Sequence, residues 1–264
     1  MNQSQVTIIL PCAGQGSRLG LETPKELFEI FPGTHLIDYS LDHILQYIRT
    51  QAEDTISNIT LTVVTRPWKK EISHYVQSRL PRITHKEVMF NENYQEWPGS
   101  VFSAQETFSL YNIVLLPDSF IGLNTHPSAP FTQSPHQETL ILSMINALQN
   151  HPVVFGCIPC TNPQRLKSLG ALRIENNIIT RFQDKPSHNV EDFNGFWGCY
   201  GFRKEYAESL YRFLIASVKH QPISLEDQPF YPPALVLIQS YHDLGTWTNI
   251  EDFKKSFTQK PPYH

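Results

Sequence analysis

Short apolar runs alternate with longer amphipathic stretches through the first 160 residues of the chain. The apolar runs are rich in β-branched residues, as buried parallel strands are. They predict strands at residues 7–11, 59–64, 87–90, 113–116 and 153–158. Between them, apolar residues recur at helical spacing, and this period predicts helices at residues 36–48, 68–80 and 138–148. Alternating strands and helices indicate a parallel sheet covered by helices on both faces.

The pattern changes after residue 160. Two short apolar runs, residues 171–174 and 178–182, flank an Asn-rich turn and predict a β-hairpin. Further along, the pattern predicts a strand at residues 196–202 and helices at 206–218 and 249–257. Residues 124–137 are rich in Pro, Ser, Thr and His without a period, which predicts a loop. The fold class is therefore α/β, with a mostly parallel mixed central sheet, helices on both faces and a small β-hairpin part.

Composition narrows the classes of function. The 264 residues are 40% hydrophobic and 17% charged, and the formal net charge is −4. No basic excess is available to neutralise a nucleic-acid backbone, so we expect no nucleic-acid partner. No apolar stretch reaches the roughly 18 residues of a membrane span, and the polar start of the chain lacks the pattern of a signal peptide. We therefore expect a cytoplasmic protein without a membrane partner.

Two of the four cysteines have Cys-x-x-Cys spacing, Cys157 and Cys160. A redox pair normally lies at a helix N-terminus, and a zinc site needs further ligands at close spacing. Here the pair ends an apolar run and Pro-rich sequence follows, with no additional ligands nearby. We expect buried, reduced thiols.

A glycine-bearing loop with two fixed cations follows the first predicted strand. Glycine lets backbone N–H groups approach an anion closely, arginine offers a bidentate fork for phosphate, and lysine adds a point charge. The loop does not contain the Gly-x-x-x-x-Gly-Lys-Ser/Thr run of a P-loop. It also departs from the dinucleotide fingerprint, because Leu19 stands where the third glycine belongs.

The loop instead matches a third pattern, Cys12-Ala13-Gly14-Gln15-Gly16-Ser17-Arg18-Leu19, five residues, then Pro24-Lys25. This run resembles the signature of the sugar-phosphate nucleotidyltransferases, also called nucleotide-sugar pyrophosphorylases. The short insert before Pro-Lys is similar to that of cytidylyl- and uridylyltransferases. The resemblance implies a Rossmann-like nucleotidyltransferase fold and a reaction of a nucleoside triphosphate (dTTP, UTP or CTP) with a sugar-1-phosphate. It also implies Mg²⁺ as cofactor. The loop residues that would bind the nucleotide are Ala13, Gly14, Gln15, Gly16 and Ser17.

Nucleotidyl transfer brings two polyanions together, so catalysis should rest on positioning and on electrostatic stabilisation by cations. The resemblance implies that Arg18 binds the β- and γ-phosphates, that Lys25 binds the α-phosphate and that Lys185 binds the acceptor phosphate. Asp118 follows a predicted strand at its C-terminal end, although Pro117 replaces the glycine of the family's strand-Gly-Asp motif. Asp243 stands in a run similar to the family's Asp-x-Gly-Thr motif. We expect the two aspartates to be the Mg²⁺ ligands.

The same resemblance also indicates which residues would bind the sugar and the nucleobase. Asp184-Lys185-Pro186 is similar to the family's Glu-Lys-Pro motif, with a shortened acid. The expected sugar-binding residues are Gly170, Asp184, Asn194 and Gly198. The expected base-binding residues are Gln95, Gly99 and Ser100, although Tyr94 occupies the usual glutamine position.

We predict a single nucleotidyltransferase domain, residues 1–264, in which residues 1–160 bind the nucleotide and residues 161–264 bind the sugar phosphate. The substrates would be its partners, and a homo-oligomer is compatible with the resemblance. Two alternatives stay open. One is a cytidylyltransferase for phosphocholine or another non-sugar phosphate, with Phe196, Trp197 and Tyr200 as an aromatic cage. The other is a non-catalytic regulatory homologue that binds a nucleotide-sugar.

Overall fold

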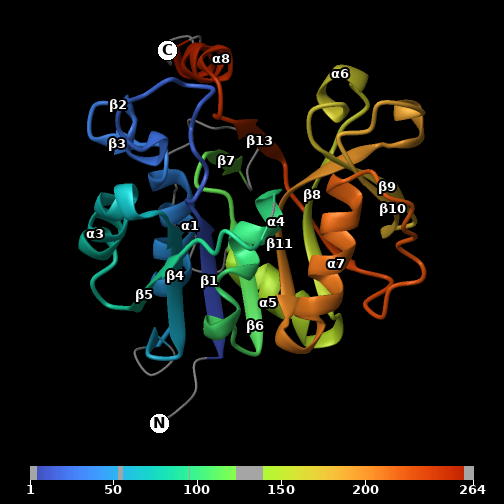
Figure 1. Cartoon of the computed structure of the whole chain (residues 1–264), viewed down its shortest axis with the longest axis horizontal. Coiled ribbons are helices and arrows are strands. Elements are labelled where there is room, and N and C mark those ends of the chain that lie inside the picture. The colour runs from blue at the N-terminus through green and yellow to red at the C-terminus, as the bar shows by residue number, and fades with distance from the viewer. Residues whose placement is uncertain (1–4, 53–55, 95, 123–138, 259–264) are drawn as a thin grey trace, which may run out of the picture.

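Nine of the described strands form one mixed sheet that runs through both parts of the chain (Figure 1). The computed structural model describes residues 5–52, 56–94, 96–122 and 139–258. The strand order is β10-β9-β11-β6-β1-β4-β5, and β8 and β12 continue the sheet from β11. The bounds are β1 (Val6–Pro11), β4 (Ile59–Thr65), β5 (Thr84–Met89), β6 (Tyr111–Leu115), β8 (Val153–Pro159), β9 (Gly170–Glu175), β10 (Ile178–Asp184), β11 (Gly195–Arg203) and β12 (Ala234–Leu237).

One half of the sheet is parallel and the other half is largely antiparallel. Strands β6, β1, β4 and β5 pair in parallel. Strand β11 is antiparallel to β6, β8 and β9, while β12 is parallel to β8. The α/β fold class with a mixed sheet is confirmed, and the strand predicted at residues 153–158 is β8, which pairs antiparallel with β11 and parallel with β12. The hairpin is confirmed as the antiparallel pair β9 and β10.

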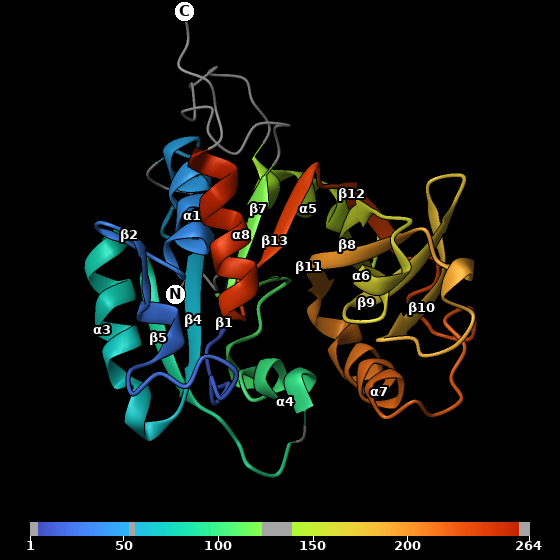
Figure 2. The same cartoon turned by 90° about the horizontal axis from the view of Figure 1, so that it is seen from above.

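Helices cover both faces of the sheet (Figure 2). Helices α1, α3 and α5 pack on one face and α4 and α7 on the other. The pleat explains the division, since Ile8 and Leu10 of β1 face the first group and Ile9 faces the second. The bounds are α1 (Asp38–Arg49), α3 (Lys70–Arg79), α4 (Glu96–Phe102), α5 (Leu140–Asn150) and α7 (Ala207–Val218).

Strand β5 starts three residues before residue 87, where the sequence predicted it to begin. The prediction missed this start because β5 is an outer, exposed strand of the sheet. Thr84, Lys86 and Glu87 lie in it, and most of its side chains are at least partly exposed. An exposed strand has no apolar run to reveal its start. The predicted loop at residues 124–137 lies outside the described residues.

A third, smaller core joins the N-terminal and C-terminal segments at one end of the sheet. It contains Leu19, Ile30 and Phe120 together with Ile250 and Phe253. Figure 1 shows α8 close to β13 at this end. The elements here are β2 (Glu29–Phe31), β3 (Thr34–His35), β7 (Ser119–Gly122), β13 (Ser240–Asp243) and α8 (Trp247–Thr258).

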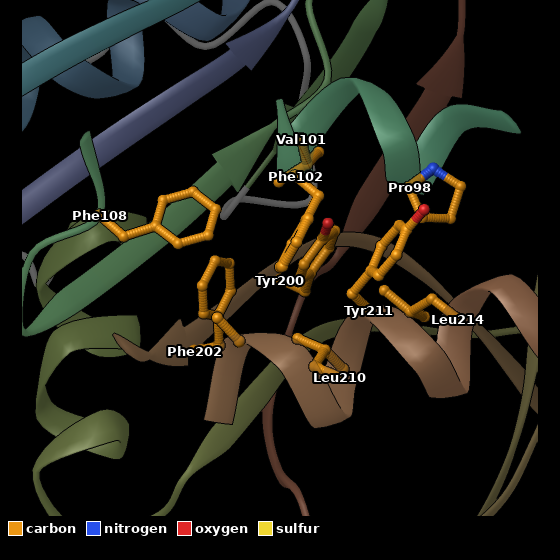
Figure 3. A pocket seen from close by; sticks show the side chains of 10 residues that line it. Pro98, Val101, Phe102, Phe108, Tyr200, Phe202, Leu210, Tyr211 and Leu214 are labelled. Atoms are coloured by element: carbon orange, nitrogen blue, oxygen red, sulfur yellow. The ribbon is translucent and has the colours of Figure 1, made fainter. Parts of the chain in front are cut away.

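The other face closes through an aromatic cluster between α4, α7 and β11 (Figure 3). Phe102 of α4 stacks on Tyr211 of α7, with 4.4 Å between ring centroids. Phe108 meets Phe202 of β11 edge to face at 5.1 Å. The small pocket among these rings is almost entirely apolar. It belongs to the packing that fixes α4 next to the sheet.

Candidate active site

The glycine-bearing loop leaves β1 at the C-terminal end of the parallel strands. Gly16 has a φ of 71°, in the left-handed region that favours glycine. A Cβ at Gly16 would lie 3.6–3.8 Å from the stem of Lys25, so the loop and this lysine pack directly together. None of the N–H groups of residues 13–18 donates to a backbone acceptor among the residues that the structure describes. The loop therefore offers a run of free amide donors.

Lys25 and Asp118 form a salt bridge between the loop and the end of β6. Lys25 starts a short 3-10 turn, Lys25–Leu27, and Asp118 follows Pro117 after β6. Burial would lower the pKa of Lys25 and raise the pKa of Asp118. Their pairing outweighs burial, so the pKa of Lys25 is raised and the pKa of Asp118 is lowered. Both groups are therefore charged at neutral pH.

The two predicted metal ligands meet through a small β ladder. Strand β7 begins at Ser119, directly after Asp118, and Ser119 pairs with Asp243 at the end of β13. The N–H of Leu244 donates to the carbonyl of Asp118 at 2.8 Å. Burial, and then the charge of Asp118, raise the pKa of Asp243. The structure thus brings two aspartates that are 125 positions apart in the sequence to one place.

Arg18 completes the group. A Cβ added to Gly245 would lie 3.0 Å from a guanidinium nitrogen of Arg18 and 3.0 Å from Oδ1 of Asp243. The N–H of Gly245 donates to the same Oδ1 at 3.0 Å. Nδ2 of Asn249 lies 3.4 Å from the other oxygen. Because Gly245 has no side chain, the Arg18 guanidinium and the Asp243 carboxylate can both lie close to this turn.

The donor set fits Mg²⁺. This cation takes one or two carboxylates and completes its octahedron with water and phosphate oxygens. Asp118 and Asp243 are two such carboxylates, and the charge of Asp118 helps to raise the pKa of Asp243, after burial. Within the described residues there is no group of three or more His, Cys, Asp or Glu side chains that could form an all-protein metal cage. The role of Asp118 and Asp243 as metal ligands stays a prediction.

Three further residues, which the sequence analysis missed, support this loop from the side of β4: Arg66, Lys69 and Glu26. Lys69 and Glu26 form an ion pair that is almost completely buried. Lys69 and Arg66 also donate to carbonyls of the loop. The sequence offered one indication, because Lys69 lies within the amphipathic period of residues 68–80 on its buried side.

The predicted base-binding segment is only partly described. Gln95 lies outside the described residues. A Cβ at Gly99 would lie 2.7 Å from Cβ of Tyr94 and 3.0 Å from its backbone carbonyl carbon, so Gly99 lets the chain at Tyr94 approach closely. Tyr94 packs among aromatic side chains and accepts a hydrogen bond from Gln105 at 2.7 Å. The hydroxyl of Ser100 is buried without a partner among the described residues. A base-binding role for Gly99 and Ser100 stays a prediction.

Three of the predicted sugar-binding residues have internal contacts instead. A Cβ at Gly170 would lie 1.8 Å from Nε1 of Trp197, and one at Gly198 would lie 2.8 Å from the ring of Tyr241. The amide of Asn194 accepts from the N–H of Ile174 and donates to its carbonyl, both at 2.8 Å. These contacts give each residue a structural role, and their sugar-binding role stays a prediction.

Asp184 and Lys185 end the hairpin strand β10 with opposite exposures. Asp184 is buried, and its N–H donates to the hydroxyl of Ser217 at 3.0 Å. Burial raises the pKa of the Asp184 carboxyl, and Lys185 partly offsets the effect. The Lys185 side chain is 60% exposed, with Nζ 4.0 Å from Asp184. This ammonium is free to meet an anion from solution.

Other predicted features fall in the core. Phe196, Trp197 and Tyr200 are buried in β11, so they offer no open cage for a quaternary ammonium. Cys157 is buried and Cys160 is partly buried, and neither forms a disulfide. Burial raises the pKa of Cys157 well above its usual range, as expected for an inert thiol. No helix in the described part of the chain is long and apolar enough to cross a membrane.

The chain is similar in structure to several sugar-phosphate nucleotidyltransferases over almost its whole length. A protein from Bacillus anthracis, assigned as a glucose-1-phosphate thymidylyltransferase and bound to sucrose, has a TM-score of 0.69 at 12% identity, with 98% of each chain covered. The chain has the fold of the sugar-phosphate nucleotidyltransferases. A UDP-glucose pyrophosphorylase in complex with UDP-glucose has a TM-score of 0.69 at 14% identity, covering 97% of this chain and 99% of the other.

A third structure of this fold, the inositol-1-phosphate CTP transferase from T. maritima, has a TM-score of 0.62 at 13% identity. It covers 99% of this chain and 100% of the other. No protein-family model matches the sequence. No curated protein matches it at a significant level either.

Proposed function

We propose that this protein is a Mg²⁺-dependent nucleotidyltransferase that joins a nucleoside triphosphate to a sugar-1-phosphate, giving a nucleotide-sugar and pyrophosphate. One observation carries the proposal. Two cations, Arg18 and Lys25, and two carboxylates, Asp118 and Asp243, converge beside a loop with free amide donors. An arrangement with both signs of charge suits a triphosphate that arrives with a divalent cation.

The attacking group is a phosphate oxygen that already carries negative charge, so the reaction needs no general base. The barrier comes from bringing two anions into line and from the charge that develops on the leaving pyrophosphate. In the proposal, the amides of residues 13–18 and the guanidinium of Arg18 bind the β- and γ-phosphates. Lys25 stabilises the α-phosphate as the new bond forms.

Asp118 and Asp243 would hold the metal, which supplies positive charge against the phosphate oxygens when it is bound. Lys25 pairs with Asp118, and this contact fixes the ammonium beside the carboxylates before substrate arrives. A preorganised cation needs little rearrangement during the reaction. Lys185, whose ammonium is exposed at the end of β10, would bind the acceptor phosphate, and the buried Asp184 would accept from a hydroxyl of the acceptor.

The solved structures of this fold support the choice of reaction class. Those described above are named for thymidylyl transfer, for UDP-glucose and for CTP transfer to inositol-1-phosphate. Thymidylyltransferase, pyrophosphorylase and CTP transferase are all names of nucleotidyl-transfer enzymes. They differ in the base and in the acceptor, so dTTP, UTP and CTP all belong in the test.

Pyrophosphate release tests the proposal. The protein is incubated with Mg²⁺ and each common nucleoside triphosphate, against a panel of sugar-1-phosphates, inositol-1-phosphate and phosphocholine. We expect release with at least one sugar-1-phosphate, and loss of that release in a Lys25→Ala variant prepared in the same way. Release with phosphocholine alone would favour the non-sugar alternative. Silence across the panel, with a nucleotide-sugar still bound in calorimetry, would favour the regulatory homologue.

A further inference from the structure

A buried lysine ties together the loop and the segment that carries Lys25. Lys69 ends a short 3-10 turn, Pro67–Lys69, directly after β4, and it is 3% exposed. Its ammonium donates to the carbonyl of Cys12 at 3.0 Å and to that of Gly14 at 2.6 Å. It also contacts both carboxylate oxygens of Glu26, at 3.1 and 2.9 Å. All three partners lie in residues 12–26, the segment that also contains Arg18 and Lys25, the residues proposed to contact the triphosphate.

A second cation from the same turn holds the carbonyl in between. Nε of Arg66 donates to the carbonyl of Ala13 at 2.7 Å. The Arg66 guanidinium is itself fixed by the face of Phe90, at 4.4 Å from the ring centroid, and by an ion pair with Glu92. Three successive carbonyls, those of residues 12, 13 and 14, therefore accept from the turn that follows β4.

The direction of these carbonyls sets the direction of the amides. In a trans peptide the C=O of one residue and the N–H of the next point to opposite sides. The peptide bonds of this loop are trans. Carbonyls held by Lys69 and Arg66 therefore turn the N–H groups of Ala13, Gly14 and Gln15 away from the β4 turn. These three amides belong to the run without a backbone acceptor among the described residues.

The ammonium of Lys69 also supports the turn that carries Lys25, through its contact with Glu26. Glu26 is fully buried and directly follows Lys25, which pairs with Asp118. Lys69 fixes the Glu26 carboxylate, and the backbone of this turn carries Lys25. A single buried cation thus connects the free amides to the lysine that faces the two aspartates.

We propose that Lys69 is a positioning residue for the phosphate site: with Arg66 and Glu26 it turns the loop amides outward and fixes Lys25 beside Asp118. We refer to Lys69, Arg66 and Glu26 as the clamp. None of the three needs to touch the substrate. The inference rests on the proposed function, because it assumes that the loop binds a phosphate chain.

The test uses inorganic tripolyphosphate as the probe, since it contains the phosphate chain without a base or sugar. Its affinity is measured by calorimetry with Mg²⁺, together with the thermal midpoint and pyrophosphate release. Three changes are compared: Lys69→Met, Glu26→Gln with Lys69→Met, and Arg66→Met. The control is Lys70→Met, which removes the exposed charge of the next residue.

We expect Lys69→Met to weaken tripolyphosphate binding at least about tenfold, because a charged donor to the loop carbonyls is lost. The single change also leaves Glu26 buried without its cation, so the thermal midpoint should fall. The double change removes both charges and should restore most of the thermal midpoint, whereas tripolyphosphate affinity should stay low. Arg66→Met should weaken binding by a smaller factor, and Lys70→Met should change neither quantity.

Stability and binding that recover together in the double variant would overturn the positioning role. They would show that Lys69 only neutralises Glu26. Unchanged tripolyphosphate affinity in both Lys69 variants would overturn it as well. If Lys69→Met does not fold, the double variant and Arg66→Met still decide the question. Failure of the proposed function is separate: the unchanged chain would then bind tripolyphosphate with the expected dependence on the clamp but release no pyrophosphate from any substrate pair.

Discussion

The two ends of the predicted substrate path are built in different ways. At the phosphate end, the charged groups come from a loop, a 3-10 turn and the ends of two strands, and each lies beside another; they are Arg18, Lys25, Asp118 and Asp243. At the sugar end, most of the predicted residues lie within strands and make internal contacts. Phosphate recognition depends on charged residues, which can be identified in a sequence. Sugar recognition depends on the shape of the space between strands, which a sequence does not reveal.

This difference leads to different expectations for substitutions. At the phosphate end, changes should reduce activity more than stability. At the sugar end, changes at glycine and asparagine should reduce stability first. Lys185, the exposed cation of the sugar end, should follow the rule of the phosphate end.

The largest effect is expected for Lys25→Ala. The change removes the ammonium proposed for the α-phosphate, so kcat should fall about 10³-fold. It also leaves Asp118 without its partner, so the thermal midpoint should be checked in parallel. Lys25→Arg, which keeps the charge but changes its shape, should recover part of the rate. Normal pyrophosphate release by Lys25→Ala would remove the basis for treating the phosphate end as catalytic.

Asp118→Asn and Asp243→Asn should each lower activity about 100-fold, because an amide is a poorer ligand for Mg²⁺ than a carboxylate. A titration with Mg²⁺ should show half-maximal activity at higher concentration in both variants. Asp252→Asn, an exposed acid of α8, is the matched control and should leave the titration unchanged. Identical Mg²⁺ titrations for all three variants would contradict a shared metal at the two aspartates.

At the sugar end, Gly170→Ala should destabilise the fold by about 1–3 kcal/mol, since the added methyl group would overlap the buried indole of Trp197. Thermal or urea unfolding measures this change. Gly14→Ala is the counterpart in the phosphate loop, where an added Cβ meets nothing within 4 Å, and it should unfold like the unchanged chain. Equal stability of the two variants would show that the comparison between the ends is wrong.

Asn194→Ala should cost about 1–3 kcal/mol of unfolding free energy, because it leaves the N–H and C=O of Ile174 without their partners. Asn194→Asp can still accept from the N–H but cannot donate to the carbonyl, so its stability should be intermediate in urea unfolding. A weaker substrate interaction with unchanged stability would instead restore Asn194 to the sugar site.

The smallest effect is expected for Lys185→Ala. The KM for the acceptor phosphate should rise about tenfold with the loss of one charged hydrogen bond, while the thermal midpoint stays the same. Lys167→Ala, another exposed lysine, is the control. Steady-state kinetics with the acceptor found in the substrate screen provides the measurement. An unchanged KM would place the acceptor phosphate elsewhere.

Most of the fold could be predicted because its buried strands and amphipathic helices leave clear periods in the sequence. The start of strand β5 and the antiparallel pairing of β8 could not, since exposed strands have weak patterns and strand pairing depends on contacts between residues far apart in the sequence. At the site, the charged residues could be found from their motifs. The partners of Lys69 lie 43 to 57 positions away, so the sequence indicated its burial but not its contacts.

Glycine shows the same limit in another form. The glycines at 16 and 170 look alike in a sequence, but a Cβ would be strained by the backbone φ of 71° at Gly16 and would overlap Trp197 at Gly170. The structure distinguishes them: Gly16 has a left-handed backbone beside Lys25, whereas Gly170 faces an indole. The backbone conformation and the neighbouring atoms distinguish the two constraints, and the sequence shows neither.

The small core at the end of the sheet has a consequence for biosynthesis. Leu19 of the glycine-bearing loop packs with Leu244 and Phe253, and its carbonyl accepts from the indole of Trp247 at 3.0 Å. The indole lies 228 positions after Leu19 in the sequence, so the ribosome makes the loop long before these partners. A nascent chain can therefore pair its parallel strands early, but it gains its second aspartate and the support of Leu19 only after Asp243 and Trp247 have been made. The proposed phosphate site is thus assembled later than the sheet that carries its first loop.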